Sequence, residues 1–227
     1  MFSRVISAAV YGIDAYIVNV ETDVGFGLPT FDMSGALGSK VREAKDRVRV
    51  AIKNSGIELT PQKIVINISP ANIRKEGTIY DLPIAIGILA ANGCFDLKIL
   101  ENVLIIGEVS LDGSINPVKG VLPMVCAAKE AGIDNCIIPK ANIAEGRIIN
   151  NINIYGVETL SQTIEILKNI AVIDGSRKNI KQADVKSGEC NKSDGNINND
   201  TYNVLERSRV KFTYGSEVKN NNHSCSY

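Results

Sequence analysis

The sequence predicts a mixed α/β layer fold, and three observations indicate it. The chain has 227 residues, of which 44% are hydrophobic, so it can bury a sizeable core. Through about Lys168, apolar runs alternate with turn signals, first as extended segments and then as helices and strands in alternation. One helical segment, LPIAIGILAANG, is apolar on nearly all sides, which is typical of a central helix. We therefore expect helices packed against a sheet.

The N-terminal half predicts a strand pair, a helix, a strand and the apolar helix. SRVISAAVYG and AYIVNVETDV predict strands joined at residues 12–14, and LPTFDMSG continues in extended form. GSKVREAKDRVRVAIKNSG predicts one amphipathic helix, capped by Ser39 and closed by Gly56. After the strand KIVINIS, we expect Asp81 to cap the apolar helix, with Pro83 in its first turn and Gly93 past its end.

The C-terminal half predicts a hairpin and then two further helix and strand pairs. VLIIGEVSLDGSINPV predicts a strand, a tight turn at Asp112 and Gly113, and a returning strand. LPMVCAAKEAG predicts a helix that ends at Gly132. The remaining segments predict a buried strand, a helical turn, a strand and an amphipathic helix, in the order CIIP, NIAEGR, NINIYGV and TLSQTIEILKN.

Composition divides the chain into a folded domain at residues 1–170 and a polar tail at residues 171–227. The tail is rich in Asn, Lys, Ser and Asp, and it has too few apolar side chains to offset the entropy of ordering itself. We expect it to be disordered. No apolar run approaches the ~20 residues that span a bilayer, and no signal-peptide pattern opens the chain. The expected location is therefore the cytoplasm, without a membrane partner.

Several kinds of catalytic site are missing from the sequence. The one histidine, His223, lies in the tail, so the domain holds no Ser-His-Asp site and no His-based metal site. No glycine is followed by lysine, which rules out a P-loop. The five cysteines have no C-x-x-C spacing and are interpreted as free thiols. We expect neither a metal nor a cofactor in this chain, and no enzymatic activity.

The loop KEG before the apolar helix, followed by GEVSLDGSINPVKGVLPMVCAAKEAGIDNCIIPKAN, resembles the proteolytic domain of the Lon peptidases. That resemblance places Ile79 at the serine position and Leu122 at the lysine position of the Ser-Lys dyad. Neither side chain can perform the chemistry, and the nearest substitutes, Thr78 and Lys119, are displaced along the chain. A Ser-Lys peptidase remains an alternative function.

A closer resemblance, over residues 1–168, is to the YifB/ComM group of magnesium-chelatase-like AAA+ ATPases. The stretches that carry it include SAAVYGIDAYIVNVETDVGFGLPTFDMSG, INISPANIRKEGTIYDLPIAIGILAANG and GEVSLDGSINPVKGVLPM. The resemblance implies an N-terminal Lon-like domain with the ribosomal protein S5 domain 2 fold, followed in the family by an ATPase module that uses ATP and Mg²⁺. It also implies DNA processing, including branch migration during natural transformation, and hexameric rings.

The polar tail stands where that module is expected to begin, so we interpret this chain as a non-catalytic scaffold domain with a truncated linker. DNA is the candidate partner. A pure oligomerisation module, likewise a homo-oligomer, is a further alternative.

Basic side chains gather on the amphipathic helix and on the loop before the apolar helix. The total charge of the chain is balanced, with 25 basic and 25 acidic residues, so DNA binding needs a local patch. The candidate DNA-binding residues are Lys40, Arg42, Lys45, Arg47, Arg49, Arg74 and Lys75. The alternative is a solvated surface with Glu43 and Arg47 paired. The helix has no aromatic side chain that could stack on bases, which argues against single-strand binding there.

Overall fold

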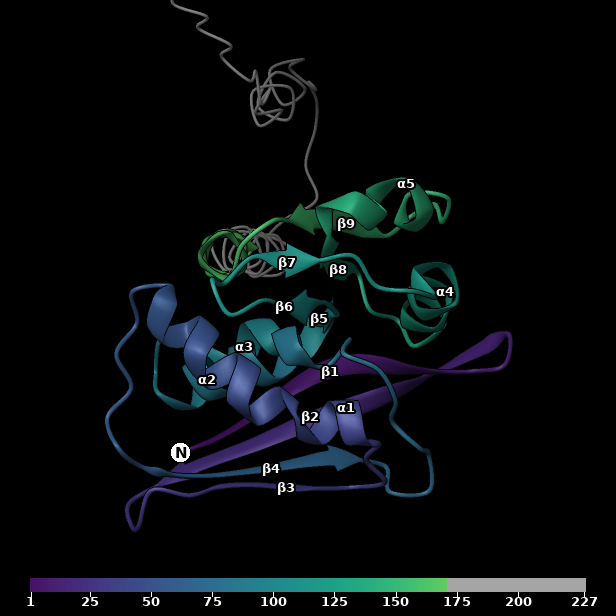
Figure 1. Cartoon of the computed structure of the whole chain (residues 1–227). Helices are drawn as coiled ribbons and strands as arrows, with labels where there is room; N and C mark the ends of the chain where they lie inside the picture. The colour runs from purple at the N-terminus through teal and green to yellow at the C-terminus, as the bar shows by residue number, and fades with distance from the viewer. Residues whose placement is uncertain (171–227) are drawn as a thin grey trace, which may run out of the picture. The chain divides into compact units, whose positions relative to one another are not determined.

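A seven-stranded sheet with helices on both faces forms the domain in the computed structural model, which describes residues 1–170 (Figure 1). The strand order is β3-β4-β2-β1-β5-β8-β9. The pairs β1–β2 and β2–β4 are antiparallel, whereas the other four pairs are parallel. The expected mixed α/β class is confirmed. The predictions for residues 171–227 lie outside the described residues.

The strands largely follow the predicted order. The sheet contains β1 (Phe2–Tyr11), β2 (Asp14–Gly25), β3 (Phe31–Ser34), β4 (Lys63–Ser69), β5 (Val103–Ile105), β8 (Asn135–Pro139) and β9 (Asn153–Val157). A separate two-stranded sheet contains β6 (Glu108–Val109) and β7 (Ile115–Asn116). The helices are α1 (Ser39–Arg42), α2 (Ala44–Asn54), α3 (Asp81–Ala91), α4 (Val121–Glu130) and α5 (Ile143–Gly146), with 3₁₀ turns η1 (Leu97–Asn102) and η2 (Lys140–Asn142). Residues 160–170 are also helical.

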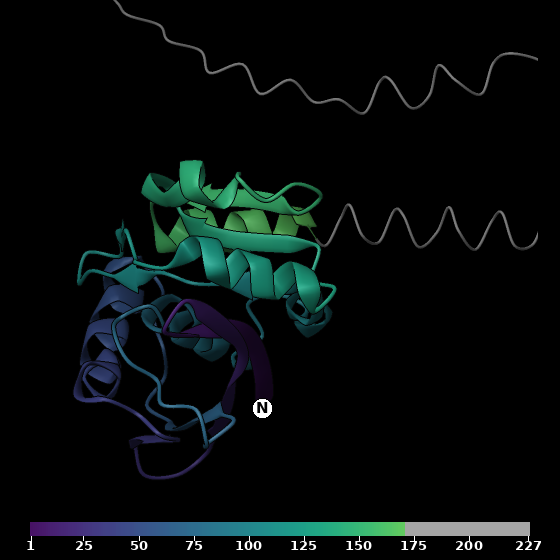
Figure 2. The ribbon, with the colours of Figure 1, turned by 90° about the vertical axis from the view of Figure 1, so that its right-hand side faces the viewer.

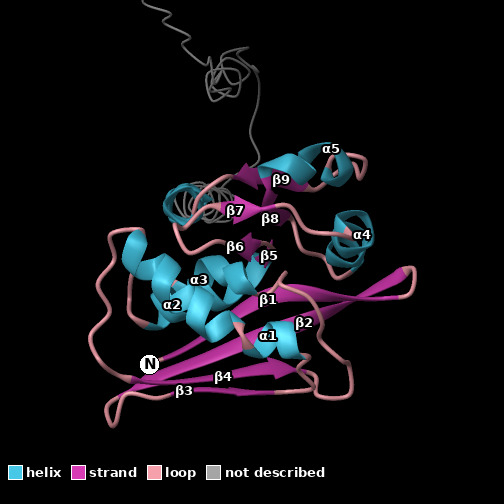
Figure 3. Ribbon diagram, viewed as in Figure 1, coloured by secondary structure: helices cyan, strands magenta, loops and turns pink. Residues whose placement is uncertain are grey.

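The hairpin of β1 and β2 is the longest part of the sheet, and Figure 3 shows its turn projecting away from the helices. Its residues alternate between the two faces of the sheet, as the twofold period of a strand requires. Val5 and Ala9 belong to the core that includes α3, whereas Ala8 belongs to the core that includes α4. The central strand β1 is therefore buried on both faces.

Helix α3 is the centre of the larger core. Every one of its residues is buried, because β1 and β2 cover one side and α2 packs on another. Close packing is visible at Gly87, where a methyl group would lie 2.6 Å from Thr22 Oγ1. Ser3 Oγ donates a hydrogen bond of 2.7 Å to the Gly87 carbonyl, which further fixes the helix on the sheet. The expectation of a central apolar helix is confirmed.

The opposite face of the sheet is covered by α4, which packs on β1 and β2. Its buried side chains form a second core with residues of β5 and β8, among them Leu104, Met124, Val125, Cys136 and Ile138. Figure 2 shows the teal and green segments that follow α3 stacked above the purple and blue N-terminal segments. None of the helices in residues 1–170 is long and apolar enough to cross a bilayer.

Two predicted elements are divided in the structure. The helix expected over residues 39–54 is interrupted at Glu43, and Gly38 rather than Ser39 occupies the N-cap position. The turn leaves both Val41 and Ala44 fully buried. The strand expected from residue 103 ends at Ile105, because Gly107 bonds to the loop before α3 and to the first turn of that helix. Gly107 N–H donates to the Ile79 carbonyl, and the Gly107 carbonyl accepts from Leu82 N–H.

Candidate nucleic-acid interface

Helix α2 carries a row of three exposed basic side chains, Lys45, Arg49 and Lys53, which we call the basic stripe. Residues four apart lie on the same side of a helix, about 6 Å apart along its axis. The neighbouring side of α2, including Val48 and Ile52, is buried in the core. Among the described residues, the three basic side chains make no hydrogen bond or ion pair. Their positive charge is thus available to an external anion.

Arg47 does not belong to this stripe, although the sequence placed it among the DNA-binding candidates. Its side chain is only 25% exposed, and its guanidinium binds both carboxylate oxygens of Asp81, at 2.8 and 2.9 Å. It also donates to the Lys40 carbonyl at 2.9 Å. The expected pair with Glu43 is present but longer, at 3.8 Å. The guanidinium of Arg47 therefore links α2 to α1 and α3, because its N–H groups donate to acceptors inside the protein.

Asp81 likewise has a different role from the predicted helix cap. The N-cap of α3 is Tyr80, with no side-chain cap, and the Asp81 carboxylate instead accepts hydrogen bonds from Arg47 and from the backbone of Val109. Its side chain is fully buried. Burial raises the pKa of Asp81, while the Arg47 guanidinium acts in the opposite direction. The hydrogen bond to Asp81 raises the pKa of Arg47, which stays charged.

The loop before α3 separates its two basic candidates. Arg74 is exposed and pairs with Glu76 at 2.7 Å, as expected for a surface side chain. Lys75 was expected at the surface, but its exposure is 0%, and its ammonium group donates to the Pro70 carbonyl. Its backbone also bonds to Ala36 and Gly38, which draws the residue inward. Burial lowers the pKa of Lys75, so this residue supports the loop rather than an interface.

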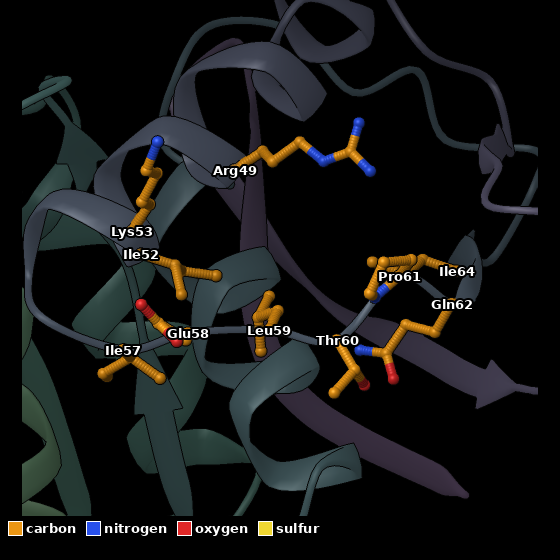
Figure 4. Close-up of a pocket in the computed structure, with 10 residues that line it drawn as sticks. All are labelled: Arg49, Ile52, Lys53, Ile57, Glu58, Leu59, Thr60, Pro61, Gln62 and Ile64. Atoms are coloured by element: carbon orange, nitrogen blue, oxygen red, sulfur yellow. The ribbon is translucent and has the colours of Figure 1, made fainter.

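A hollow adjoins the C-terminal half of the basic stripe. Arg49 and Lys53 form one of its walls, and the segment 57–62 before β4 forms another (Figure 4). Its volume is about 390 Å³, and apolar side chains such as Ile52 and Leu59 contribute to its lining. In Figure 4 the Arg49 guanidinium extends across the hollow toward Pro61. Arg49 can therefore contact a ligand on the outer surface of α2 or at the rim of this hollow.

A larger hollow of about 690 Å³, which we call the hairpin cleft, lies beside Val10 and Tyr11, the last two residues of β1. The loop before α3 lines it with Thr78 and Ile79, and Lys119 lines it from the segment before α4. The Thr78 hydroxyl donates a hydrogen bond to the Glu108 carboxylate, which also accepts one from the Asn116 side-chain amide. The chain thus brings Thr78 and Lys119 to one cleft, although they are 41 positions apart in sequence (119 minus 78).

The two positions assigned to a lost peptidase dyad do not share this cleft. Ile79 lines it and packs on both cores, whereas Leu122 lines a different hollow with Tyr16 and Cys126. Both side chains are hydrocarbons, so neither can attack a peptide bond or carry its proton. The cleft also has Tyr11 at its rim, a residue to which the sequence gave no role. Only the long hairpin brings Tyr11 beside the loop of α3, and no local motif signals that contact.

ATP and Mg²⁺, which the family resemblance implies for an ATPase module, do not fit the described residues. A phosphate-binding P-loop requires lysine after glycine, and this sequence has no such pair. Within residues 1–170, no three His, Cys, Asp or Glu side chains are grouped so that they could hold a metal ion.

Comparison with known proteins gives a family match over more than half of the chain. The model of the family described as subunit ChlI of Mg-chelatase matches residues 20–142. This range extends from β2 to the 3₁₀ turn η2 and includes the basic stripe, all of α3 and most of the hairpin cleft.

Individual relatives fall into two groups. Competence protein ComM of Haemophilus influenzae is 36% identical over 163 residues, which cover 72% of this chain and 32% of that protein. The uncharacterized protein YifB of Escherichia coli is 40% identical over 148 residues, 65% of this chain and 29% of that protein. The Archaeal Lon protease of Thermococcus kodakarensis is 31% identical over 151 residues, 64% of this chain and 23% of that protein. The chain spans between about a quarter and a third of the length of the curated relatives that it matches.

Proposed function

The chain belongs to the family of the ChlI subunit of Mg-chelatase, and on this premise we propose that it is a non-catalytic scaffold domain that contacts the DNA backbone through α2. The likeness to a competence protein and to YifB supports the assignment to the ComM and YifB branch of that family. The proposed role is in DNA processing, of the kind that accompanies branch migration in natural transformation. ATP would be used by an ATPase module and not by this domain.

The observation that carries the proposal is the basic stripe. Lys45, Arg49 and Lys53 are exposed, lie one turn apart and have no partner within the described residues. A helix with that pattern can neutralise successive phosphates without reading the base sequence. Arg42 of α1 is also exposed, and its Nε donates a hydrogen bond of 3.3 Å to the Leu37 carbonyl. Arg47 and Lys75 are left out, because their charged groups are bound inside the protein.

The test is fluorescence anisotropy of the full chain with a labelled duplex over a series of salt concentrations. In the variant Lys45→Ala/Arg49→Ala/Lys53→Ala, alanine keeps the helix favourable while three charges are removed. We expect weaker binding and a salt slope that falls by about 0.9 for each phosphate contact that is lost. A matched control, Lys98→Ala/Lys129→Ala/Arg147→Ala, removes three exposed charges from other elements. Equal losses in the two variants would show that net charge, and not the stripe, governs binding.

The proposal includes association of several copies, which the family resemblance describes as a hexameric ring. Light scattering with and without DNA measures this directly. A ring whose duplex binding is insensitive to salt and to the stripe variant would favour the alternative of a pure oligomerisation module.

A further inference from the structure

The hairpin cleft combines an exposed aromatic ring with cations from three separate segments. Tyr11, at the end of β1, is 71% exposed and lines the cleft. Lys40 comes from α1, Arg74 from the loop before α3, and Lys119 from the segment before α4. A large exposed aromatic side chain surrounded by cations is the combination by which proteins hold unpaired nucleotides, because the ring stacks on a base while the cations bind the backbone.

Two carboxylates, Glu76 and Glu108, also line the cleft, so its three cations leave one net positive charge. Glu108 already accepts hydrogen bonds from Thr78 and Asn116, and Glu76 is paired with Arg74. The ammonium groups of Lys40 and Lys119, by contrast, have no hydrogen-bond or ion-pair partner in the part of the chain that the structure describes. Both lysine side chains are exposed. The cleft therefore favours an anionic ligand.

The cleft is large enough for a single nucleotide, and its exposed tyrosine needs an unpaired base. Its volume of about 690 Å³ is in the range of sites that hold one small molecule, and an unstacked nucleotide is a ligand of that class. In a duplex the bases are paired and stacked, so no base face is free for Tyr11. A duplex can still reach the basic stripe, which needs phosphates alone.

The cleft continues along α1. A smaller adjoining hollow shares Lys40 and Arg74 with it and continues to Gly38 and Ser39. The Lys40 carbonyl accepts a hydrogen bond from Arg47, which ties the α1 wall of the cleft to α2 on a different side of that helix from the basic stripe. A DNA strand bound in the cleft would exit from it beside α1 and α2.

We propose that the hairpin cleft binds an unpaired nucleotide of single-stranded DNA, with Tyr11 stacking on its base and Lys40, Arg74 and Lys119 contacting the backbone. This inference rests on the proposed function and adds a second, strand-selective site to it. Duplex DNA would occupy the stripe alone, whereas a junction between duplex and single strand would occupy both sites.

The test compares labelled oligo(dT) with a blunt duplex of equal length, using the full chain. Tyr11→Leu keeps an apolar side chain but removes the ring, so we expect about ten-fold weaker binding of oligo(dT) and less than two-fold change for the duplex. Tyr11→Phe should retain single-strand binding. Tyr16→Leu is the matched control, since Tyr16 is an exposed tyrosine of the same hairpin that lies outside the cleft. Lys119→Ala should lower the salt slope for oligo(dT) by about 0.7.

The outcomes separate this inference from the proposed function. If the chain binds duplex through the stripe while Tyr11→Leu leaves oligo(dT) binding unchanged, the cleft is not a single-strand site and the inference fails alone. If neither DNA form binds at low salt, the proposed function fails as well. An equal loss for both DNA forms in Tyr11→Leu, accompanied by a change in oligomeric state, would assign Tyr11 to a contact between copies and overturn the inference.

Discussion

At the scale of single residues, the cations on the surface of α2 are open to an external anion, whereas a cation bound inside the protein is not. Arg47 and Arg49 are two positions apart and look equivalent in the sequence. A helix turns 100° per residue, so they lie on different sides, and only Arg47 can reach the buried carboxylate of Asp81. The sequence predicted the density of basic residues, but it could not predict which of them is bound by a residue 34 positions away.

Removing Arg47 should therefore destabilise the fold more than it affects DNA binding. In Arg47→Met, the Asp81 carboxylate remains buried without its cation, and we expect a loss of about 3 kcal/mol at pH 7. Urea unfolding measures this loss. Arg49→Met is the control on the same helix, and its exposed side chain should change stability by about 0.5 kcal/mol or less. The double variant Arg47→Met/Asp81→Asn should recover part of the loss, because the amide oxygen can still accept from Val109.

The stability lost in the single variant Arg47→Met should depend on pH. Burial raises the pKa of Asp81 above its ordinary value of 3.8, so the folded state holds a proton that the unfolded state releases. The contribution of Asp81 to the free energy of unfolding is thus fully present below about pH 4. It is lost as the pH rises through the raised pKa of Asp81. Loss of Arg47 raises that pKa further. The deficit of Arg47→Met relative to the natural sequence should grow between pH 4 and pH 7, and a constant deficit would contradict the ion pair.

At the scale of elements, hydrophobic periodicity predicted most helices and strands, because each element buries one side. The alternation along β1 and the amphipathic pattern of α2 are examples. Periodicity did not predict the turn at Glu43 or the end of β5 at Ile105. Both depend on contacts between distant segments, such as the hydrogen bonds from Gly107 to the start of α3.

The packing of α3 on the hairpin allows a test at Gly87. Gly87→Ala gains about 1 kcal/mol of helix propensity, but its methyl group would meet Thr22 Oγ1 at 2.6 Å, and overpacking costs about 1 to 3 kcal/mol. We expect a net loss of about 1 kcal/mol in chemical denaturation. Thr22→Ala removes the obstructing hydroxyl, which has no hydrogen-bond partner among the described residues. The double variant should be more stable than the sum of the single effects predicts, whereas additivity would exclude a contact between the two positions.

At the scale of the whole molecule, the sequence predicted the fold class and the family, whereas only the structure divides the candidate site into a stripe and a cleft. The family match covers residues 20–142, which include the stripe and the loop before α3. Net charge is zero, so any affinity for DNA must come from local positive surfaces. The stripe lies on α2 alone, whereas the cleft arises where α1, the loop before α3 and the segment before α4 meet, so no single stretch of sequence contains it.

The proposed contact of duplex DNA with the outer side of α2 is tested most directly by NMR mapping of amide shifts on the full chain. A short duplex is titrated at low salt into the isotopically labelled protein. We expect the largest shifts in α1 and α2, around Arg42, Lys45, Arg49 and Lys53, with small changes in the buried helix α3. The assignment of the basic stripe as the DNA contact would be contradicted if binding reached saturation without a change in the chemical shifts of the α2 amides. Shifts confined to another face of the domain would contradict it as well.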